Sequence, residues 1–188
     1  MMFLKDILVL DFETSGIDPN ICNPIQIGAV LLDKDSFKIK AEFSATCKPI
    51  NDDWSAEAEG VHGLSRDFLM KSGTDLSTAI KDFESAFDLS NVIIASWNMF
   101  DTEILRRLVG IKKYRNLYKF IELWSYTYPF TVVNDLHFSK ERDHGFNDLV
   151  LYFDIKRNEK HDALQDAKIE AEIFKLVTQV YTGMQYRL

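Results

Sequence analysis

The sequence predicts an α/β domain built on a mixed β-sheet, and two patterns in the chain support this fold class. Up to residue 47, three apolar segments with the length of strands follow one another, separated by turn-forming residues. From residue 54 onward, segments with helical periodicity alternate with one further strand-like segment. The first pattern is typical of an antiparallel meander, whereas the order strand, helix, strand, helix requires a crossover between parallel strands.

Four segments are predicted to be strands because each is short, largely apolar and bounded by turn-forming residues. They are residues 5–11, 24–32, 37–47 and 91–96. The first ends in carboxylates and is followed by an expected loop that begins at Thr14, so its end is predicted to open on a site. In the third, Lys38 and Lys40 alternate with apolar residues, which indicates one face in contact with water.

Helices are predicted where apolar residues recur at helical spacing. These segments are residues 55–60, a short segment after residue 65, 75–87, 100–109, 145–153 and 162–181. Asp75 stands where it can cap the third helix, and Ala163 and Ala167 begin the core-facing stripe of the last. Residues 112–130 are aromatic and partly basic, and their pattern leaves helix, strand edge and loop open.

The length and composition of the chain indicate a single domain over residues 1–188 with a substantial core, since 46% of the 188 residues are apolar. No apolar run approaches the roughly 18 residues that span a bilayer, so we expect neither a membrane segment nor a signal peptide. Cys22 and Cys47 form no CxxC pair, which predicts neither a zinc knuckle nor a disulfide framework. A cytoplasmic location is the expectation.

The formal net charge of −7 argues at first against a nucleic-acid partner, because phosphate backbones are bound mainly through Lys and Arg. Four of the acidic side chains are nevertheless candidate metal ligands. Two divalent cations bound there would offset four of the seven charges, so net charge says little about the site itself.

Five side chains form the pattern that specifies a reaction: Asp11, Glu13, Asp101, His161 and Asp166. Asp11 and Glu13 end the first strand, and the alternation of strand side chains points both to one side. Asp101 follows the strand at 91–96, whose predicted neighbour carries Asp11, so both acids are expected at the same end of the sheet. Asp166 borders the apolar stripe of the last helix, where an unpaired carboxylate would be unfavourable and a metal ion would compensate it.

Each of these residues also has an ordinary structural interpretation. Asp11 and Glu13 could be a solvated strand end, and Asp101 could be an acid favoured by the dipole at a helix N-terminus. His161 could be a structural or surface histidine, and Asp166 a solvated helix residue. The functional hypothesis depends on the combination of all five.

The combination resembles the DEDDh (DnaQ-like) family of 3′-to-5′ exonucleases, which has a ribonuclease H-like fold. The DxET motif of that family is matched by residues 11–14, its second motif by Phe100-Asp101, and its HxxxxDA motif by residues 161–167. Residues 62–65 (HGLS) also resemble the HGI/L segment of the family. One departure is Trp97, which stands where many members have Asn, with Asn98 one residue later.

The resemblance implies a central mixed five-stranded sheet, an antiparallel meander plus parallel strands, flanked by helices. It also implies a metal-dependent enzyme that hydrolyses single-stranded DNA or RNA from the 3′ end and releases nucleoside 5′-monophosphates. Two ions, Mg²⁺ or Mn²⁺, would be held by Asp11, Glu13, Asp101 and Asp166, with neutral His161 as the general base. Thr14 would lie near the terminal 3′-hydroxyl, and Leu64 and Phe100 around the last base, although core packing is an equal interpretation for Phe100.

Several alternatives stay open at this point. A non-catalytic ribonuclease H-like interaction module would be expected to lack a ligand residue, and a nucleotide phosphohydrolase would need a closed pocket instead of a groove. The motifs decide neither DNA against RNA nor whether the chain works with a polymerase, with a repair partner or as a homodimer. Two basic clusters could guide the strand: Arg106, Arg107, Lys112, Lys113 and Arg115, and Lys156, Arg157 and Lys160.

Overall fold

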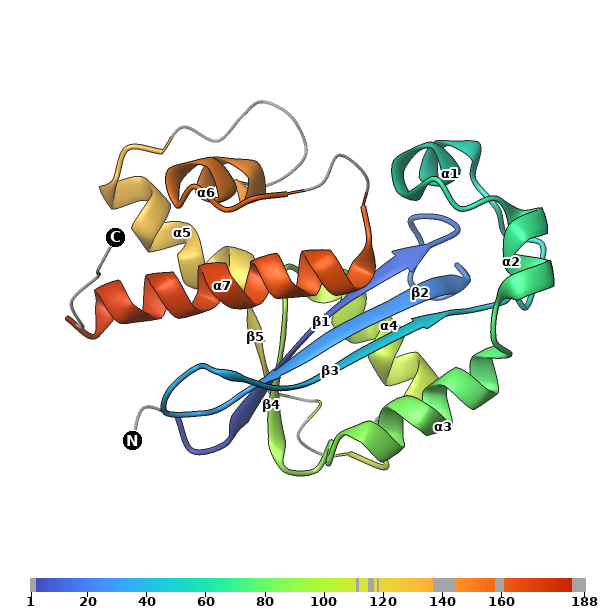
Figure 1. Cartoon of the computed structure of the whole chain (residues 1–188), viewed down its shortest axis with the longest axis horizontal. Helices are drawn as coiled ribbons and strands as arrows, with labels where there is room; N and C mark the ends of the chain where they lie inside the picture. Colours follow the sequence, from blue (N-terminus) through green and yellow to red (C-terminus); the bar gives the residue numbers. More distant parts are fainter. Residues whose placement is uncertain are drawn as a thin grey trace.

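The computed structural model confirms the predicted α/β class, with one mixed five-stranded sheet between two layers of helices (Figure 1). It describes residues 3–110, 112–114, 117, 119–136, 145–157 and 161–183. The strands lie in the order β3-β2-β1-β4-β5, and their bounds are β1 (Asp6–Thr14), β2 (Pro24–Leu32), β3 (Ile39–Thr46), β4 (Val92–Ser96) and β5 (Phe120–Glu122). β1 pairs antiparallel with β2 and parallel with β4, so the central strand joins the meander to the crossover half of the sheet.

The helices form two layers, one on each face of the sheet. Their bounds are α1 (Ala56–His62), α2 (Arg66–Ser72), α3 (Leu76–Ala86), α4 (Met99–Val109), α5 (Leu123–Val133), α6 (Phe146–Tyr152) and α7 (Ala163–Tyr181). The apolar residues of α3 and α4 pack in one core cluster, and those of α5, α6 and α7 pack in a second. In Figure 1 the long helix α7 crosses the strands, and α1 and α2 lie beyond one end of the sheet.

The side chains of the central strand divide between these two cores. Leu8 and Leu10 are fully buried in the cluster with α3 and α4, whereas Ile7 and Val9 are fully buried in the cluster with α7. Because strand side chains alternate, Asp11 and Glu13 continue the side of Ile7 and Val9. The periodicity of β1 therefore directs both carboxylates toward the face that α7 covers.

The expected end of the first strand was wrong by three residues. β1 continues through Thr14 because its last residues extend the ladder with β2, where Phe12 pairs with Ile27 and Glu13 with Gln26. Both carboxylates are consequently fixed on a hydrogen-bonded strand instead of standing at its loose end.

The expected side-chain cap at Asp75 is also absent. Asp75 occupies the N-cap position of α3, but its side chain makes no capping hydrogen bond. Its Oδ1 atom instead accepts a hydrogen bond from Lys48 Nζ at 3.0 Å, so the ion pair with the neighbouring segment replaces the cap.

The segment that the sequence pattern left open forms β5 and α5. β5 has three residues, which is too short to show alternation, and it is the edge strand beside β4. Helix α5 contains Pro129, and this residue argues against a helix when only the sequence is considered. The tertiary packing of Leu123 and Phe130 in the α7-side core compensates for that disadvantage.

Two expectations concern surfaces. Among the described residues, no helix has the length and apolarity needed to cross a membrane.

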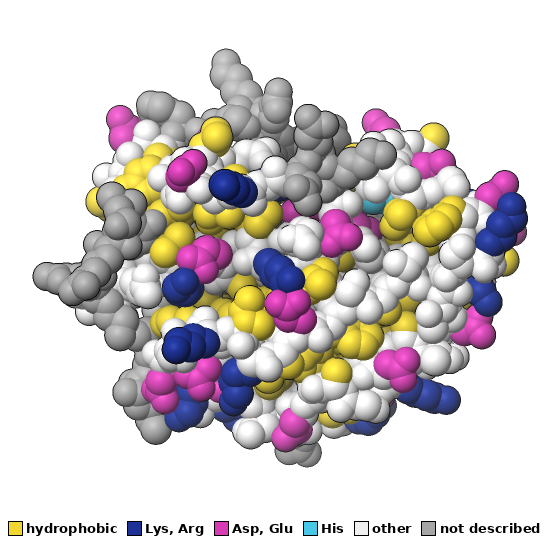
Figure 2. Space-filling model, viewed as in Figure 1, with side chains coloured by type: hydrophobic (Ala, Val, Ile, Leu, Met, Phe, Trp, Pro, Cys, Tyr) yellow, Lys and Arg dark blue, Asp and Glu magenta, His cyan; other side chains and the backbone are white. Residues whose placement is uncertain are grey.

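On the face drawn in Figure 2, Lys and Arg side chains of the described residues are interspersed with Asp and Glu and form no single basic patch. In the first predicted basic cluster, Arg107 donates hydrogen bonds to the backbone oxygens of Asn20 and Cys22, and Arg106 bonds that of Leu117. Arg115 of that cluster and Lys160 of the second lie outside the described residues.

Candidate active site

The approach of α7 to the sheet is set by a glycine opposite the first acidic residue. Gly28 of β2 pairs with Asp11 of β1, and a Cβ atom at Gly28 would lie 2.1 Å from the backbone carbonyl of Ala163. No larger residue fits there without moving the helix. The start of α7 thus rests directly on the strands beside Asp11.

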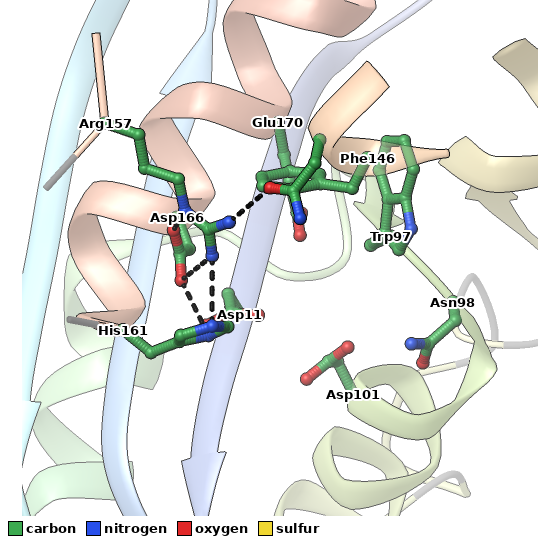
Figure 3. Close-up of a pocket in the computed structure, with 10 residues that line it drawn as sticks. Asp11, Trp97, Asn98, Asp101, Phe146, Arg157, His161, Asp166 and Glu170 are labelled. Atoms are coloured by element: carbon green, nitrogen blue, oxygen red, sulfur yellow. Dashed lines mark hydrogen bonds and ion pairs between the residues drawn. The ribbon is translucent and has the colours of Figure 1, made fainter. Parts of the chain in front are cut away.

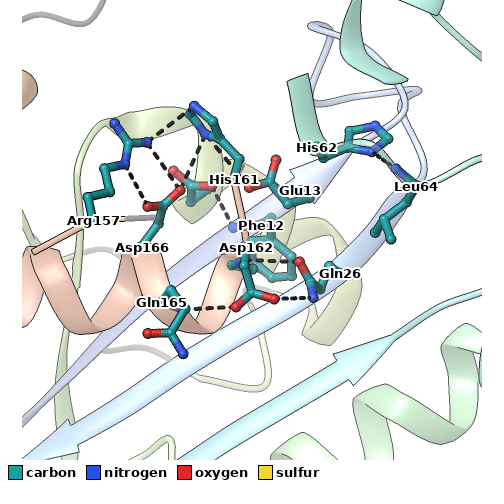
Figure 4. Close-up of polar contacts among 12 residues, drawn as sticks. Phe12, Glu13, Gln26, His62, Leu64, Arg157, His161, Asp162, Gln165 and Asp166 are labelled. Atoms are coloured by element: carbon teal, nitrogen blue, oxygen red, sulfur yellow. Dashed lines mark hydrogen bonds and ion pairs between the residues drawn. The ribbon is translucent and has the colours of Figure 1, made fainter. Parts of the chain in front are cut away.

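Hydrogen bonds fix the same end of α7 to β2. The Asp162 side chain caps the helix by accepting from the Gln165 backbone N–H at 3.0 Å. Gln26 of β2 donates to the second oxygen of Asp162 at 3.0 Å and accepts the Ala163 backbone N–H at 3.0 Å (Figure 4). This clamp aims the first turn of α7, and with it Asp166, at the carboxylates of β1.

Asp101 reaches the site from the other layer, in the first turn of α4. The pairing of β1 with β4 ends at Val9 and Ala95, and beyond that point the Phe12 backbone N–H donates to Asp101 Oδ1 at 3.1 Å. Asn98 caps α4 by accepting from the Phe100 backbone N–H at 2.8 Å. The divergence of the two strands therefore leaves a space that Asp101 borders.

His161 lies at the entrance to α7 and faces two of the acids. Its Nδ1 atom is 3.3 Å from Asp166 Oδ2 and 3.9 Å from Glu13 Oε1. One ligand atom from each of Glu13, His161 and Asp166 lies within 4.8 Å of the others, a spacing that could hold a metal ion. Glu13 and Asp166 are buried, whereas the His161 side chain is 44% exposed.

The structure thus brings the five candidate residues together. Four of them line one pocket, and the fifth, Glu13, adjoins them through its approach to His161. Asp101 stands across the pocket from His161 and Asp166 (Figure 3). The pocket has a volume of about 230 Å³, and its described lining contains Asp11, Asp101, His161, Asp166, Arg157, Glu170, Trp97, Asn98, Phe146 and Asn147. Four carboxylates and a single guanidinium in this lining leave an excess of negative charge.

The pKa values of the acids reflect that excess. Burial, followed by repulsion from Asp101, Glu170 and other acids, raises the pKa of Asp11 well above its usual value. Burial likewise raises the pKa of Glu13 and that of Asp101 to about 7 each. A bound cation would reverse these shifts, and carboxylate oxygens with one imidazole and no thiol suit a hard divalent ion. The donor set therefore fits a metal ion.

Five lining residues were absent from the predicted site: Glu170, Trp97, Asn98, Phe146 and Asn147. Glu170 lies one helical turn beyond Asp166 and is 2% exposed. One of its oxygens accepts the Trp97 backbone N–H, and Oε2 has no hydrogen-bond partner among the described residues. The spacing of four residues from Asp166 was the available signal, since it places both acids on one helix face. Arg157 was predicted only as part of a basic cluster, whereas it lies inside the pocket.

A second pocket adjoins the first and contains two of the three predicted substrate contacts. Its volume is about 540 Å³, and its lining includes Thr14, Phe100, Val61, His62, Ile17, Ala58 and Asn98 together with Glu13. The Thr14 hydroxyl donates to the Gly16 backbone oxygen at 2.7 Å. Leu64 is not in the described lining, and its backbone N–H instead donates to His62 Nδ1 at 3.0 Å (Figure 4).

The hydrogen bond from Leu64 also determines the tautomer of His62. Burial lowers the pKa of His62, so the ring is neutral, and because Nδ1 accepts, the proton must be on Nε2. His62 Nε2 has no partner among the described residues. His62 thus lines the second pocket as a neutral ring whose donor atom is buried.

A family model described as an exonuclease (RNase_T) matches residues 8–174, which include all five candidate residues. The chain belongs to the RNase_T exonuclease family. The resemblance that the motifs indicated is therefore confirmed, and so is the expectation that the chain is a member of an exonuclease family that depends on divalent metal.

Two curated proteins illustrate the range of the RNase_T family around this chain. The PolC-type DNA polymerase III of Thermotoga petrophila is 27% identical over 167 residues, which cover 89% of this chain but only 11% of the polymerase. The 3′-5′ DNA exonuclease Cap18 of Escherichia coli is 28% identical over 191 residues and is covered to 94%, as is this chain. The chain thus spans about a tenth of the polymerase and nearly all of Cap18.

Solved structures are similar to this chain in fold. A complex of Escherichia coli exonuclease I with single-stranded DNA superposes with a TM-score of 0.78 at 19% identity, covering 96% of this chain and 42% of that one. At this identity the likeness supports the fold alone, and it confirms the ribonuclease H-like architecture implied by the motifs.

Proposed function

We propose that this chain is a metal-dependent 3′-to-5′ exonuclease that releases nucleoside 5′-monophosphates from single-stranded DNA. The observation that carries the proposal is the convergence of Asp11, Glu13, Asp101, His161 and Asp166 at a pocket with uncompensated negative charge. DNA is the favoured substrate because Cap18, similar over nearly its full length, is named a DNA exonuclease.

In this proposal Asp11, Glu13 and Asp166 would hold one divalent cation, and Asp11 with Asp101 a second, Mg²⁺ or Mn²⁺. Such a pair supplies charge stabilisation to the entering and leaving oxygens of an in-line displacement. The strand ladder and the Gln26 clamp on α7 keep the carboxylates in place, so little reorganisation accompanies the reaction.

His161 would act as the general base. Arg157 Nη2 lies 3.2 Å from His161 Nε2 and can only donate, so in the neutral ring Nε2 carries the lone pair and Nδ1 the proton. Nδ1 then donates to Asp166 Oδ2, which fixes the tautomer and the ring orientation. The hydrogen bond to Asp166 raises the pKa of His161, and this strengthens Nε2 as an acceptor for the proton of the attacking water.

The second pocket would receive the terminal nucleoside. Phe100 and Val61 offer apolar surface to a base of any identity, in line with low sequence preference. Thr14 follows Glu13 in the chain and both line the second pocket, so a 3′-hydroxyl beside Thr14 would lie close to that carboxylate. Leu64 would contribute through His62, which its backbone orients.

The test uses single-stranded DNA and RNA oligonucleotides labelled at either end, with Mg²⁺, Mn²⁺ or a chelator. A 5′ label should give a ladder of shortening products, and a 3′ label should give labelled mononucleotide at the earliest times. Asp166→Asn is the matched inactive control. Internal cuts, activity in chelator, or release of phosphate from free nucleotides without shortening of the strand would overturn the proposal.

A further inference from the structure

Arg157 is the cation that the candidate site itself supplies. Its Nε is 3.3 Å from Asp166 Oδ1, and its Nη2 is 3.4 Å from Asp166 Oδ2. Nη2 also lies 3.2 Å from Nε2 of His161. The guanidinium thus binds the Asp166 carboxylate, which is expected to bind metal. It also faces the Nε2 lone pair of His161, which is expected to accept a proton. Both groups must be released before they can act.

The guanidinium also contacts the first residues of α6. Its Nη1 donates to Asn147 Oδ1 at 2.8 Å, and its carbon lies 4.8 Å from the centre of the Phe146 ring (Figure 3). The side chain is 19% exposed, and both supporting residues line the pocket. This cradle leaves the donors on the opposite edge of the guanidinium, Nε and Nη2, for a ligand in the pocket.

The other arginines of the two predicted basic clusters that the structure describes are used differently. Arg106 and Arg107 donate to backbone oxygens of neighbouring segments, which is a structural role. Lys156, the neighbour of Arg157, is exposed. Among the described members of these clusters, Arg157 alone presents a two-donor edge to the pocket of acids.

We propose that Arg157 is a catalytic residue that binds the phosphate under attack, and that this contact replaces its pairing with Asp166. This inference rests on the proposed exonuclease function. The edge that now meets both oxygens of a carboxylate fits two oxygens of a phosphate equally well. A phosphate within reach of water activated by His161 must lie beside Asp166, and hence beside this edge of Arg157.

A consequence is that substrate and metal assist each other. While Arg157 pairs with Asp166, it competes with a cation for the same oxygens. When a phosphate draws the guanidinium away, Asp166 is free for the ion and His161 Nε2 is free for water. By linkage, the presence of either ligand then raises the affinity for the other.

Two binding measurements without turnover test this. Calorimetric titration of the nucleic-acid-free protein with Mn²⁺ should show tighter binding in Arg157→Ala than in the wild type, by about fivefold or more. In chelator, fluorescence anisotropy should show weaker binding of a single-stranded oligonucleotide to Arg157→Ala, with the slope of log K against log salt reduced by about 1. Lys156→Ala removes one positive charge from the adjacent residue and is the control. It should change the Mn²⁺ affinity and the oligonucleotide affinity much less than Arg157→Ala does.

The coupling itself is measured with product. Thymidine 5′-monophosphate should raise the Mn²⁺ affinity of the wild type more than that of Arg157→Ala, and thymidine without phosphate should do so for neither. Arg157→Lys keeps the charge without the fork and should recover only part of the coupling. Circular dichroism establishes that each variant is folded before it is compared.

A purely structural role for Arg157 would weaken both ligands together, and this outcome overturns the inference. Equal behaviour of Arg157→Ala and Lys156→Ala would overturn it as well, because general attraction of the strand would then account for the cluster. In either case the wild type would still shorten 3′ ends, whereas failure of the proposed function would appear as no shortening at all.

Discussion

The acidic side chains on the two sides of the candidate pocket differ in how their negative charge is compensated. On the α7 side, Asp166 is paired with Arg157 and His161. On the α4 side, Asp101 is 4% exposed and is met by backbone N–H groups, while burial raises its pKa to about 7. One side is thus compensated by an internal ion pair, whereas Asp101 has only backbone N–H partners among the described residues and keeps a raised pKa. In the proposed metal site, the ion pair on one side would therefore have to be released before a cation binds, whereas the acids on the other side would be compensated by the cation directly.

The largest effect is expected from neutralising an acid on either side. Asp101→Asn and Asp166→Asn should each lower kcat/KM on a single-stranded oligonucleotide on the order of 10²–10³-fold, because each removes charge that would stabilise the reaction. Their effects on stability without metal should have opposite signs. Asn at 101 still accepts the Phe12 N–H without a buried charge, whereas Asn at 166 leaves Arg157 without its partner.

Thermal unfolding in chelator measures that difference. Asp101→Asn should unfold at a higher temperature than the wild type, and Asp166→Asn at a lower one. If both variants shifted in the same direction, the distinction between a compensated and an uncompensated side would be lost.

His161 belongs to the compensated side, and its replacement should separate catalysis from metal binding. His161→Ala should lose about 10²–10⁴-fold in kcat/KM, the range for removal of a general base. Its Mn²⁺ affinity, measured by calorimetry, should fall much less, since the carboxylates remain. Because His161 can accept a proton only in its neutral form, wild-type activity should decline as the pH falls through the titration of His161. A pH–rate profile without this acid limb would remove His161 from the role of base.

The pH dependence of stability should reveal the uncompensated side. Glu13 and Asp101 have pKa values raised to about 7 in the folded protein, so the native state binds more protons than the unfolded chain. The contribution of these two groups to the free energy of unfolding in chelator is therefore fully present below about pH 4, where they are protonated in both states, and is lost as the pH rises through 7. The loss should be on the order of a few kcal/mol. Saturating Mn²⁺ at pH 8 should restore it, and urea titrations at both pH values measure the effect.

Much of this arrangement could be predicted from the sequence, because the five candidate residues stand at fixed places relative to strands and helices. The alternation in β1 predicted that Asp11 and Glu13 share a side, and the apolar stripe of α7 predicted that Asp166 faces inward. Gly28 could not be assigned a role in this way, because an isolated glycine in an apolar strand does not tell what approaches it. Its contact with Ala163 arises between residues far apart in the chain.

The pairing of Arg157 was hidden for a similar reason. A basic residue close to His161 in sequence is equally compatible with a solvated surface, and only the position of α6 supplies Phe146 and Asn147 as its cradle. β5 escaped prediction because three residues at a sheet edge carry too little pattern. What the sequence left open was therefore the contacts between layers and the short edge strand.

The smallest effect is expected at Glu170, which extends the uncompensated side onto α7. Burial and repulsion from Asp101 raise its pKa well above the usual value, and Oε2 has no partner among the described residues. Glu170→Gln keeps an acceptor for the Trp97 N–H and cannot ionise, so its unfolding temperature in chelator should exceed that of the wild type by a margin that grows as the pH is raised, about 2–4 °C or roughly 1 kcal/mol once the carboxyl ionises. As the pH falls and Glu170 is protonated, the two proteins should approach the same unfolding temperature. A lower unfolding temperature of the variant at high pH would instead mean that the ionised carboxylate is already compensated, which would place Glu170 with Asp166 and not with Asp101.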